Sequence, residues 1–119
     1  MSRVLVIEDE EDIRLLTRVI LEGSGHQVIE AATGEAGLSA LERELPDLVL
    51  LDIRLPGIDG WDVLERINAT EGWSDLQVVV MSAHSSGDAL ERAKSLGITT
   101  YLLKPFTRDA LLHAVGTAT

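Results

Sequence analysis

Four aliphatic residues, Leu48 to Leu51, run without a break and end abruptly at Asp52. A continuous apolar run of this length is typical of a strand buried on both faces, as in a parallel sheet covered by helices. The residues that follow, up to Gly60, include a proline and two glycines, which force the chain to turn. Asp52 is therefore expected where a buried strand leaves the sheet. In open α/β sheets, ligands and chemistry gather at this carboxyl edge.

The rest of the chain repeats the pattern, because short apolar segments alternate with segments whose apolar residues recur at helical spacing. This alternation predicts an α/β fold with a parallel sheet, and the 119 residues are expected to form one domain, residues 1–119. The predicted strands are 3–7, 26–31, 48–51, 76–81 and 99–103. The predicted helices are 12–22, 35–44, one after the cap Asp59 to about Ala69, one capped by 85–88 that reaches Leu96, and one after the cap Thr107.

Composition excludes several classes of function. The formal net charge is −10 at pH 7, which argues against direct binding to nucleic acid or to anionic membranes. The sequence has no cysteine, which excludes disulfides and thiolate chemistry, and its apolar runs are too short to cross a bilayer. The amino terminus leads directly into the first strand without the pattern of a signal peptide. We therefore expect a cytoplasmic protein.

Polar residues follow the predicted strands at one edge of the sheet. Glu8 and Asp9 follow the first strand, Asp52 the third, Ser82 the fourth and Lys104 the fifth. In the flavodoxin-like doubly wound sandwich, a five-stranded (βα)5 fold, the strand order is 2-1-3-4-5, so the first and third strands flank the switch point. In that order Asp9 and Asp52 converge, with Glu8 close by.

Converging carboxylates repel one another unless a proton or a cation lies between them. An all-oxygen set of ligands favours Mg²⁺ or Mn²⁺, and no histidine or cysteine lies at this edge to favour zinc. A hydroxyl at Ser82 and a positive charge at Lys104 match the oxygens of a phosphoryl group carried by Asp52. Considered singly, Asp52 could be a strand-end cap, Ser82 a loop hydroxyl and Lys104 a solvated charge. Their placement together favours phosphoryl transfer.

Four separate motifs carry a resemblance to a known family. They are V-L-V-I-E-D-E at 4–10, L-L-D-I-R-L-P-G-I-D-G at 50–60, M-S-A at 81–83 and Y-L-L-K-P-F at 101–106. Over essentially its whole length the sequence resembles the receiver domain of bacterial two-component response regulators. The motifs also keep the family's order and spacing.

The resemblance implies that Asp52 is the phosphoacceptor of a Mg²⁺-dependent reaction. Asp9 would bind the metal directly, Glu8 through water, and Arg54 through its backbone carbonyl. The side chain of Arg54 and the position of His84 border the path of attacking water in this family, where they could tune the lifetime of the phosphoryl group.

The resemblance also implies a switch. Ser82 and Lys104 would hold the phosphoryl oxygens, with a cis peptide bond between Lys104 and Pro105. Tyr101 matches an aromatic residue that moves between exposed and buried positions on activation. The face made by the fourth helix, the fifth strand and the fifth helix would then change shape.

The implied partners are a sensor histidine kinase or a histidine phosphotransfer protein, and a downstream effector protein or fused output domain. Kinase recognition is expected on the exposed face of the first helix. The domain would catalyse its own phosphorylation and dephosphorylation and would not be a turnover enzyme.

Three other functions share part of this pattern. A haloacid-dehalogenase-type phosphatase needs a second aspartate two residues after its nucleophile, where this sequence has Arg54. A flavodoxin-like FMN carrier needs a phosphate loop rich in serine, threonine and glycine after the first strand, where this sequence has five acids, 8–12. The remaining alternative is a receiver-like interaction module that is not phosphorylated.

Overall fold

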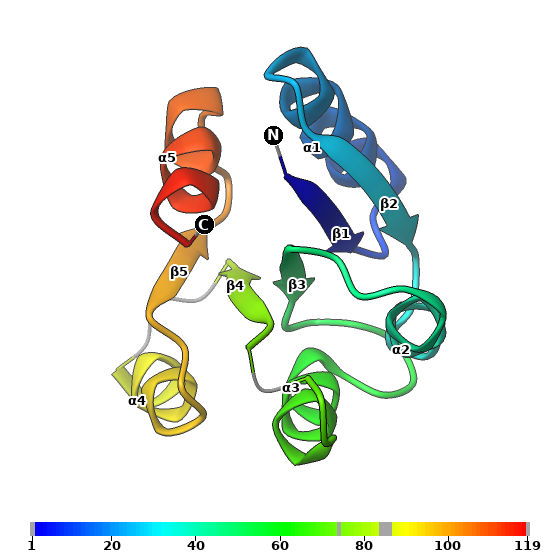
Figure 1. Ribbon diagram of the computed structural model, residues 1–119. Coiled ribbons are helices and arrows are strands. Elements are labelled where there is room, and N and C mark those ends of the chain that lie inside the picture. Colours follow the sequence, from blue (N-terminus) through cyan, green and yellow to red (C-terminus); the bar gives the residue numbers. More distant parts are fainter. Residues whose placement is uncertain (1, 74, 84–86, 119) are drawn as a thin grey trace.

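In a computed structural model of the protein, five strands form one parallel sheet in the predicted order β2-β1-β3-β4-β5 (Figure 1). The structure describes residues 2–73, 75–83 and 87–118. The strands are β1 (Arg3–Ile7), β2 (Gln27–Ala31), β3 (Leu48–Asp52), β4 (Gln77–Ser82) and β5 (Thr100–Leu103). The helices are α1 (Glu11–Gly23), α2 (Gly34–Arg43), α3 (Gly60–Ala69), α4 (Gly87–Ser95) and α5 (Arg108–Ala118).

Helices cover both faces of the sheet, with α1 and α5 on one face and α2, α3 and α4 on the other (Figure 1). Along β1, Val4 and Val6 pack with the first pair of helices, whereas Leu5 and Ile7 pack with the second group. Both faces of the central strands are therefore buried, which explains why β1 and β3 need unbroken apolar runs. The predicted doubly wound sandwich is confirmed.

The predicted strand ends differ from the structure by no more than one residue. Asp52 and Ser82 are themselves the last residues of β3 and β4, whereas the sequence pattern placed them just beyond the strands. Both remain in the sheet because a neighbouring strand still provides a partner. Asp52 pairs in register with Met81, and Ser82 pairs with Leu103.

The helix caps predicted at Asp59 and Thr107 are confirmed, and Thr33 forms a further cap. The Thr33 hydroxyl accepts a hydrogen bond from the first turn of α2, and the Thr107 hydroxyl accepts one from the first turn of α5. The predicted cap Asp59 forms a capping box with Asp62 at the start of α3. Of the cap predicted at 85–88, Gly87 and Asp88 lie in the first turn of α4, whereas 85–86 lie outside the described residues, as does His84. Within the described part of the chain, no helix has the length and apolar character needed to span a membrane.

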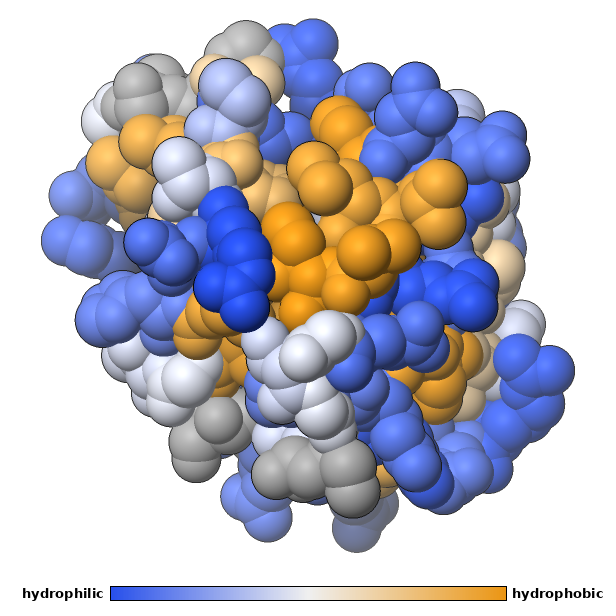
Figure 2. Space-filling model, turned by 90° about the horizontal axis from the view of Figure 1, so that it is seen from above, coloured by the Kyte–Doolittle hydropathy of each residue, from blue (hydrophilic) through white to orange (hydrophobic). Residues whose placement is uncertain are grey.

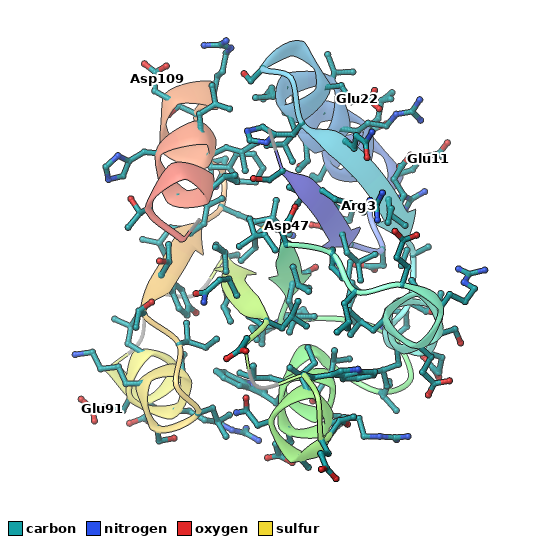
Figure 3. All side chains as sticks on the ribbon, viewed as in Figure 1. Arg3, Glu11, Glu22, Asp47, Glu91 and Asp109 are labelled. Atoms are coloured by element: carbon teal, nitrogen blue, oxygen red, sulfur yellow. The ribbon has the colours of Figure 1, made fainter. Side chains whose placement is uncertain are left out.

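A reciprocal pair of contacts aligns the two central strands at their amino ends. The Arg3 N–H donates to Asp47 Oδ2 at 2.8 Å, and the Asp47 N–H donates to the Arg3 carbonyl, also at 2.8 Å (Figure 3). The register that follows ends with Ile7 beside Leu51. Glu8, which follows β1, and Asp52, the last residue of β3, therefore lie at the same level of the sheet.

Gly60 is required for α3 to begin against the end of β3. Its N–H donates to the Ile53 carbonyl at 2.9 Å. A Cβ at this position would lie 2.4 Å from the Asp52 carbonyl oxygen and 2.5 Å from Ile53 Cα. Both are backbone atoms that no rotamer change can move, so the helix and the strand end approach this closely only with glycine.

We predict that Gly60→Ala lowers the free energy of unfolding by about 1–3 kcal/mol, because the added methyl group forces the backbone of Asp52 and Ile53 to shift. Gly116→Ala is the matched control, since a Cβ there meets nothing within 4 Å and Gly116 also lies in a helix. The control is expected to be neutral or slightly stabilising. Urea unfolding of both variants checks this, and an equal effect at the two positions would contradict the steric explanation.

Candidate functional site

Three charged side chains from three strands meet at the carboxyl edge of the sheet. Lys104 Nζ lies 3.2 Å from Asp52 Oδ2 and forms an ion pair with Glu8 Oε1. Glu8 is fully buried, and Asp52 is only 3% exposed. The ammonium group therefore lies between two buried carboxylates.

Each of these carboxylates shares its two oxygens between the lysine and a backbone amide. Glu8 Oε2 accepts a hydrogen bond from the Glu10 N–H at 3.2 Å. Asp52 Oδ1 accepts one from the Arg54 N–H at 3.1 Å. The loops after β1 and β3 thus hold the acids from one side while Lys104 holds them from the other. Buried carboxylates are costly unless they are partnered in this way.

The electrostatics of the cluster favour protons on both Glu8 and Lys104. The pKa of Glu8 is raised from 4.5 to about 7, chiefly because the carboxyl group is buried; the Lys104 hydrogen bond opposes this rise and Asp52 adds to it. Burial alone would lower the pKa of Lys104. The hydrogen bond to Glu8 and the charges of Asp52 and Glu8 outweigh that effect, so this pKa is raised above its usual value.

A third acid, Asp9, lies at the exposed mouth of the cluster. One carboxylate oxygen from each of Glu8, Asp9 and Asp52 lies within 4.8 Å of the others. When these acids are ionised, one lysine leaves an excess of negative charge beside an open hollow, which is lined by Asp9, Arg54, Asp59 and Trp61, among others. Oxygen ligands and uncompensated negative charge are what a hard divalent cation requires. The residues present therefore fit Mg²⁺ or Mn²⁺.

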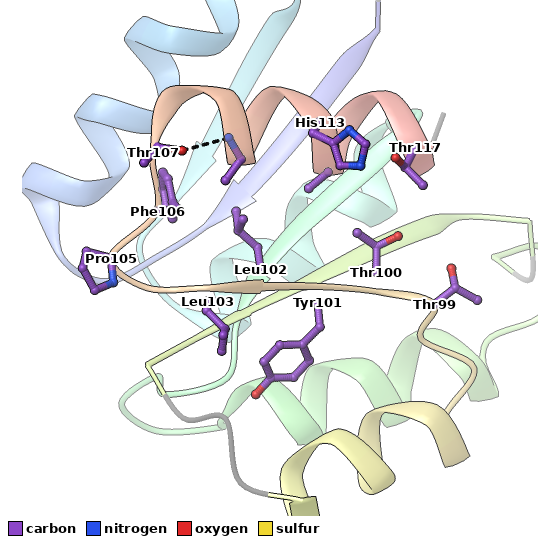
Figure 4. A pocket seen from close by; sticks show the side chains of 12 residues that line it. Thr99, Thr100, Tyr101, Leu102, Leu103, Pro105, Phe106, Thr107, His113 and Thr117 are labelled. Atoms are coloured by element: carbon purple, nitrogen blue, oxygen red, sulfur yellow. Dashed lines mark hydrogen bonds between the residues drawn. The ribbon is translucent and has the colours of Figure 1, made fainter.

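Ser82 is buried at the end of β4, and its carbonyl accepts a hydrogen bond from the Lys104 N–H at 2.9 Å. This contact ties the backbone of the lysine to the neighbouring strand. The predicted cis peptide bond between Lys104 and Pro105 is confirmed. Figure 4 shows half-buried Tyr101 on the side of β5 that faces α4, opposite Leu102.

The site also contains residues that sequence reasoning did not identify. Arg14 Nη1 donates a hydrogen bond to the Glu8 carbonyl at 2.9 Å. Trp61 lines the hollow, and the guanidinium carbon of Arg92 on α4 lies 4.6 Å from the centroid of its ring. The position of Arg14, a cationic residue two positions after five consecutive acids, was a sequence signal that it could contact the acidic segment. Trp61 had no comparable signal, because its position depends on how α3 packs.

Comparison with known proteins identifies the family to which this fold belongs. Residues 4–116 match the family model described as response regulator receiver domain. Sporulation initiation phosphotransferase F of Bacillus subtilis is 34% identical over 114 residues, which cover 96% of this chain and 90% of that protein. The KDP operon transcriptional regulatory protein KdpE of Escherichia coli is 42% identical over 106 residues, which cover 89% of this chain and 46% of that protein.

The solved structures give the same result for the fold. Chemotaxis protein CheY4 of Vibrio cholerae superposes with a TM-score of 0.94 at 23% identity, covering 100% of this chain and 99% of that chain. A putative response regulator from Chloroflexus aurantiacus gives a TM-score of 0.92 at 28% identity, covering 98% of this chain and 96% of that one.

The chain belongs to the receiver domains of two-component response regulators. It spans about half the length of the transcriptional regulators that it matches.

The raised pKa of Glu8 predicts a pH-dependent stability of the metal-free protein. Because the folded chain binds this proton more tightly than the unfolded chain, the contribution is fully present below pH 4.5 and is lost as pH rises through about 7. The free energy of unfolding should fall from about pH 5 to about pH 8, with Glu8 contributing at most about 3 kcal/mol. Urea unfolding in EDTA across this range measures the fall.

Glu8→Gln is the matched variant, since it keeps the size of the side chain but cannot titrate. The difference in stability between wild type and variant should change with pH over this window. Parallel curves for the two proteins would show that Glu8 does not titrate there.

Proposed function

We propose that this receiver domain accepts a phosphoryl group on Asp52 from the phosphohistidine of a sensor histidine kinase or a histidine phosphotransfer protein. The observation that carries the proposal is the Lys104 ammonium held between buried Glu8 and Asp52 at the switch point of the sheet. Membership of the receiver family supports the same chemistry.

In the proposed step, an Asp52 carboxylate oxygen attacks the phosphorus, a P–O bond forms and the P–N bond to the donor imidazole breaks, leaving its electron pair on the ring nitrogen. Lys104 balances the charge on the transferred oxygens, and the Ser82 hydroxyl donates to one of them. A divalent cation held by Asp9, Asp52, the Arg54 carbonyl and, through water, Glu8 would neutralise further developing charge. Because the chain is both acceptor and catalyst, we propose no turnover of an external substrate.

We propose that phosphorylation changes the face made by α4, β5 and α5. The modification adds roughly one and a half to two negative charges beside Ser82 and Lys104. Their movement toward the phosphoryl group would let Tyr101, now half-buried against α4, move inward. We describe this as a shift between existing conformers. The output would pass to an effector protein or a fused output domain in the cytoplasm, without direct contact between this chain and nucleic acid.

Intact-mass analysis after incubation with acetyl phosphate and Mg²⁺ tests the chemistry directly. Wild type should gain the mass of one phosphoryl group. Asp52→Asn should gain none, because an amide is not a nucleophile for phosphorus, and wild type without metal should gain little. Asp62→Asn is a control that alters an acid of the α3 capping box and leaves the site intact.

The absence of any adduct, even at short reaction times, would overturn the proposal and favour an interaction module that acts without phosphorylation. An adduct on Asp52→Asn would place the acceptor elsewhere.

We propose that the phosphodonor protein docks on the face that carries α1. Leu15, Leu16 and Val19, three large apolar side chains that are exposed, lie on this helix. The helix begins directly after residues 8–10, which we call the acidic loop. Figure 2 views the molecule from the side of α1 and α5 and shows an apolar area there. An apolar surface beside the phosphoacceptor suits a helical partner that must bring its histidine to the site.

Leu16→Asp should slow phosphotransfer from a histidine kinase that phosphorylates wild type by roughly tenfold or more, because it puts a charge in the apolar contact. Phosphorylation by acetyl phosphate should be unchanged, since that donor needs no docking surface. Leu45→Asp is the control, because Leu45 is 43% exposed compared with 51% for Leu16 and precedes β3 at the opposite edge of the sheet. Equal transfer rates to both variants would exclude this docking face.

A further inference from the structure

Arg14 joins the acidic loop to the edge of the sheet. From the first turn of α1 its Nη1 donates to the Glu8 carbonyl at 2.9 Å, and its Nε donates to Glu30 Oε1 on β2 at 3.1 Å. Only 18% of its side chain is exposed. The second oxygen of Glu30 accepts from Arg18 Nη1 at 3.0 Å. Glu30 is thereby fixed between two arginines, and Arg14 is fixed by Glu30.

We propose that Arg14 is a positioning residue, which sets the conformation of the loop 8–10 so that Asp9 and Glu8 can bind the divalent cation. The inference rests on the proposed cation site. Arg14 contacts the backbone carbonyl of Glu8 and not its carboxylate. The inference concerns the backbone that carries the acids.

The geometry shows how the effect would pass from Arg14 to the acids. The Glu8 N–H donates to the Ala31 carbonyl at 3.0 Å, which continues the pairing of β1 with β2. The Glu8 carbonyl turns instead to Arg14. Because the peptide group is planar, fixing this carbonyl fixes the Glu8–Asp9 peptide and the direction in which Asp9 leaves it. Asp9 is exposed, so burial does not hold its side chain in place, and its backbone must be held by contacts such as this one.

The contact requires arginine and not merely a positive charge. Two different nitrogens of one planar guanidinium bridge a carboxylate on β2 and a carbonyl on the acidic loop. Lysine offers a single point charge and cannot hold both acceptors in this fixed arrangement. Arg14→Lys therefore retains the charge and removes the bridge.

A positioning role and a purely electrostatic role predict opposite changes in cation affinity when Arg14 is replaced by alanine. If Arg14 acted only as a nearby positive charge, its removal would strengthen cation binding by reducing repulsion. If it positions the loop, its removal weakens cation binding despite the lost repulsion. Arg18→Ala is the matched control, because it removes the same charge from the same helix and from the same partner, Glu30. Arg18 forms its ion pairs with Glu22 and Glu30.

The experiment is isothermal titration calorimetry with Mg²⁺ alone on wild type, Arg14→Lys, Arg14→Ala and Arg18→Ala, with thermal unfolding in EDTA to establish that each is folded. Both Arg14 variants should bind Mg²⁺ roughly tenfold or more weakly, the loss typical of residues that orient metal ligands. Arg18→Ala should bind as tightly as wild type or more tightly.

Unchanged or tighter binding by a folded Arg14→Lys would overturn the inference, even if its unfolding temperature were lower, because that result would leave Arg14 a purely structural role. Wild type that binds no Mg²⁺ would overturn the cation site itself and with it this inference. Binding by all four proteins alike would leave the proposed function intact and remove only the role of Arg14.

Discussion

The ammonium of Lys104 between the carboxylates of Glu8 and Asp52 is the interaction on which the site depends. Parallel pairing of β1 with β3 brings two acids to the same level of a sheet that is buried on both faces. Without a cation their repulsion and desolvation would oppose that pairing, and removal of one partner from such a buried group is strongly destabilising. Lys104 stabilises the arrangement but cannot neutralise three ionised acids, so the charge that remains would favour a divalent cation at the proposed site.

The scaffold places these groups by constraints that lie outside the site. Reciprocal contacts between Arg3 and Asp47 set the register of β1 and β3 from the opposite end of the strands. Gly60 lets α3 begin against the backbone of Asp52, where any side chain would collide. The acids are thus held at the ends of rigid elements, while Asp9 lies on a loop at the exposed mouth. Rigid placement of Asp52 suits the role of nucleophile proposed for it.

Much of this could be predicted from the sequence. The unbroken apolar runs of β1 and β3 identified buried parallel strands, and the polar residue after each run identified the site edge. The strand ladder still extends through Asp52 and Ser82, because hydrogen bonding to a neighbour continues where hydrophobicity stops. The pairing of Lys104 with Glu8, and the raised pKa that burial gives Glu8, depend on side-chain directions and could not be predicted. The same holds for Trp61, which packing of α3 turns toward the hollow.

The order of these residues along the chain has a consequence for biosynthesis. Lys104 lies 96 residues after Glu8, and β5, which ends just before it, is an edge strand that joins the sheet only beside β4. A growing polypeptide therefore contains both buried acids long before it contains their cation. Until β5 docks, Glu8 and Asp52 lack the ammonium group, and a proton on one of them must relieve their repulsion when the centre of the sheet closes. If Asp52 is the phosphoacceptor, as proposed, the complete set of charges around it therefore forms only after the last strand of the sheet has been synthesised and has docked.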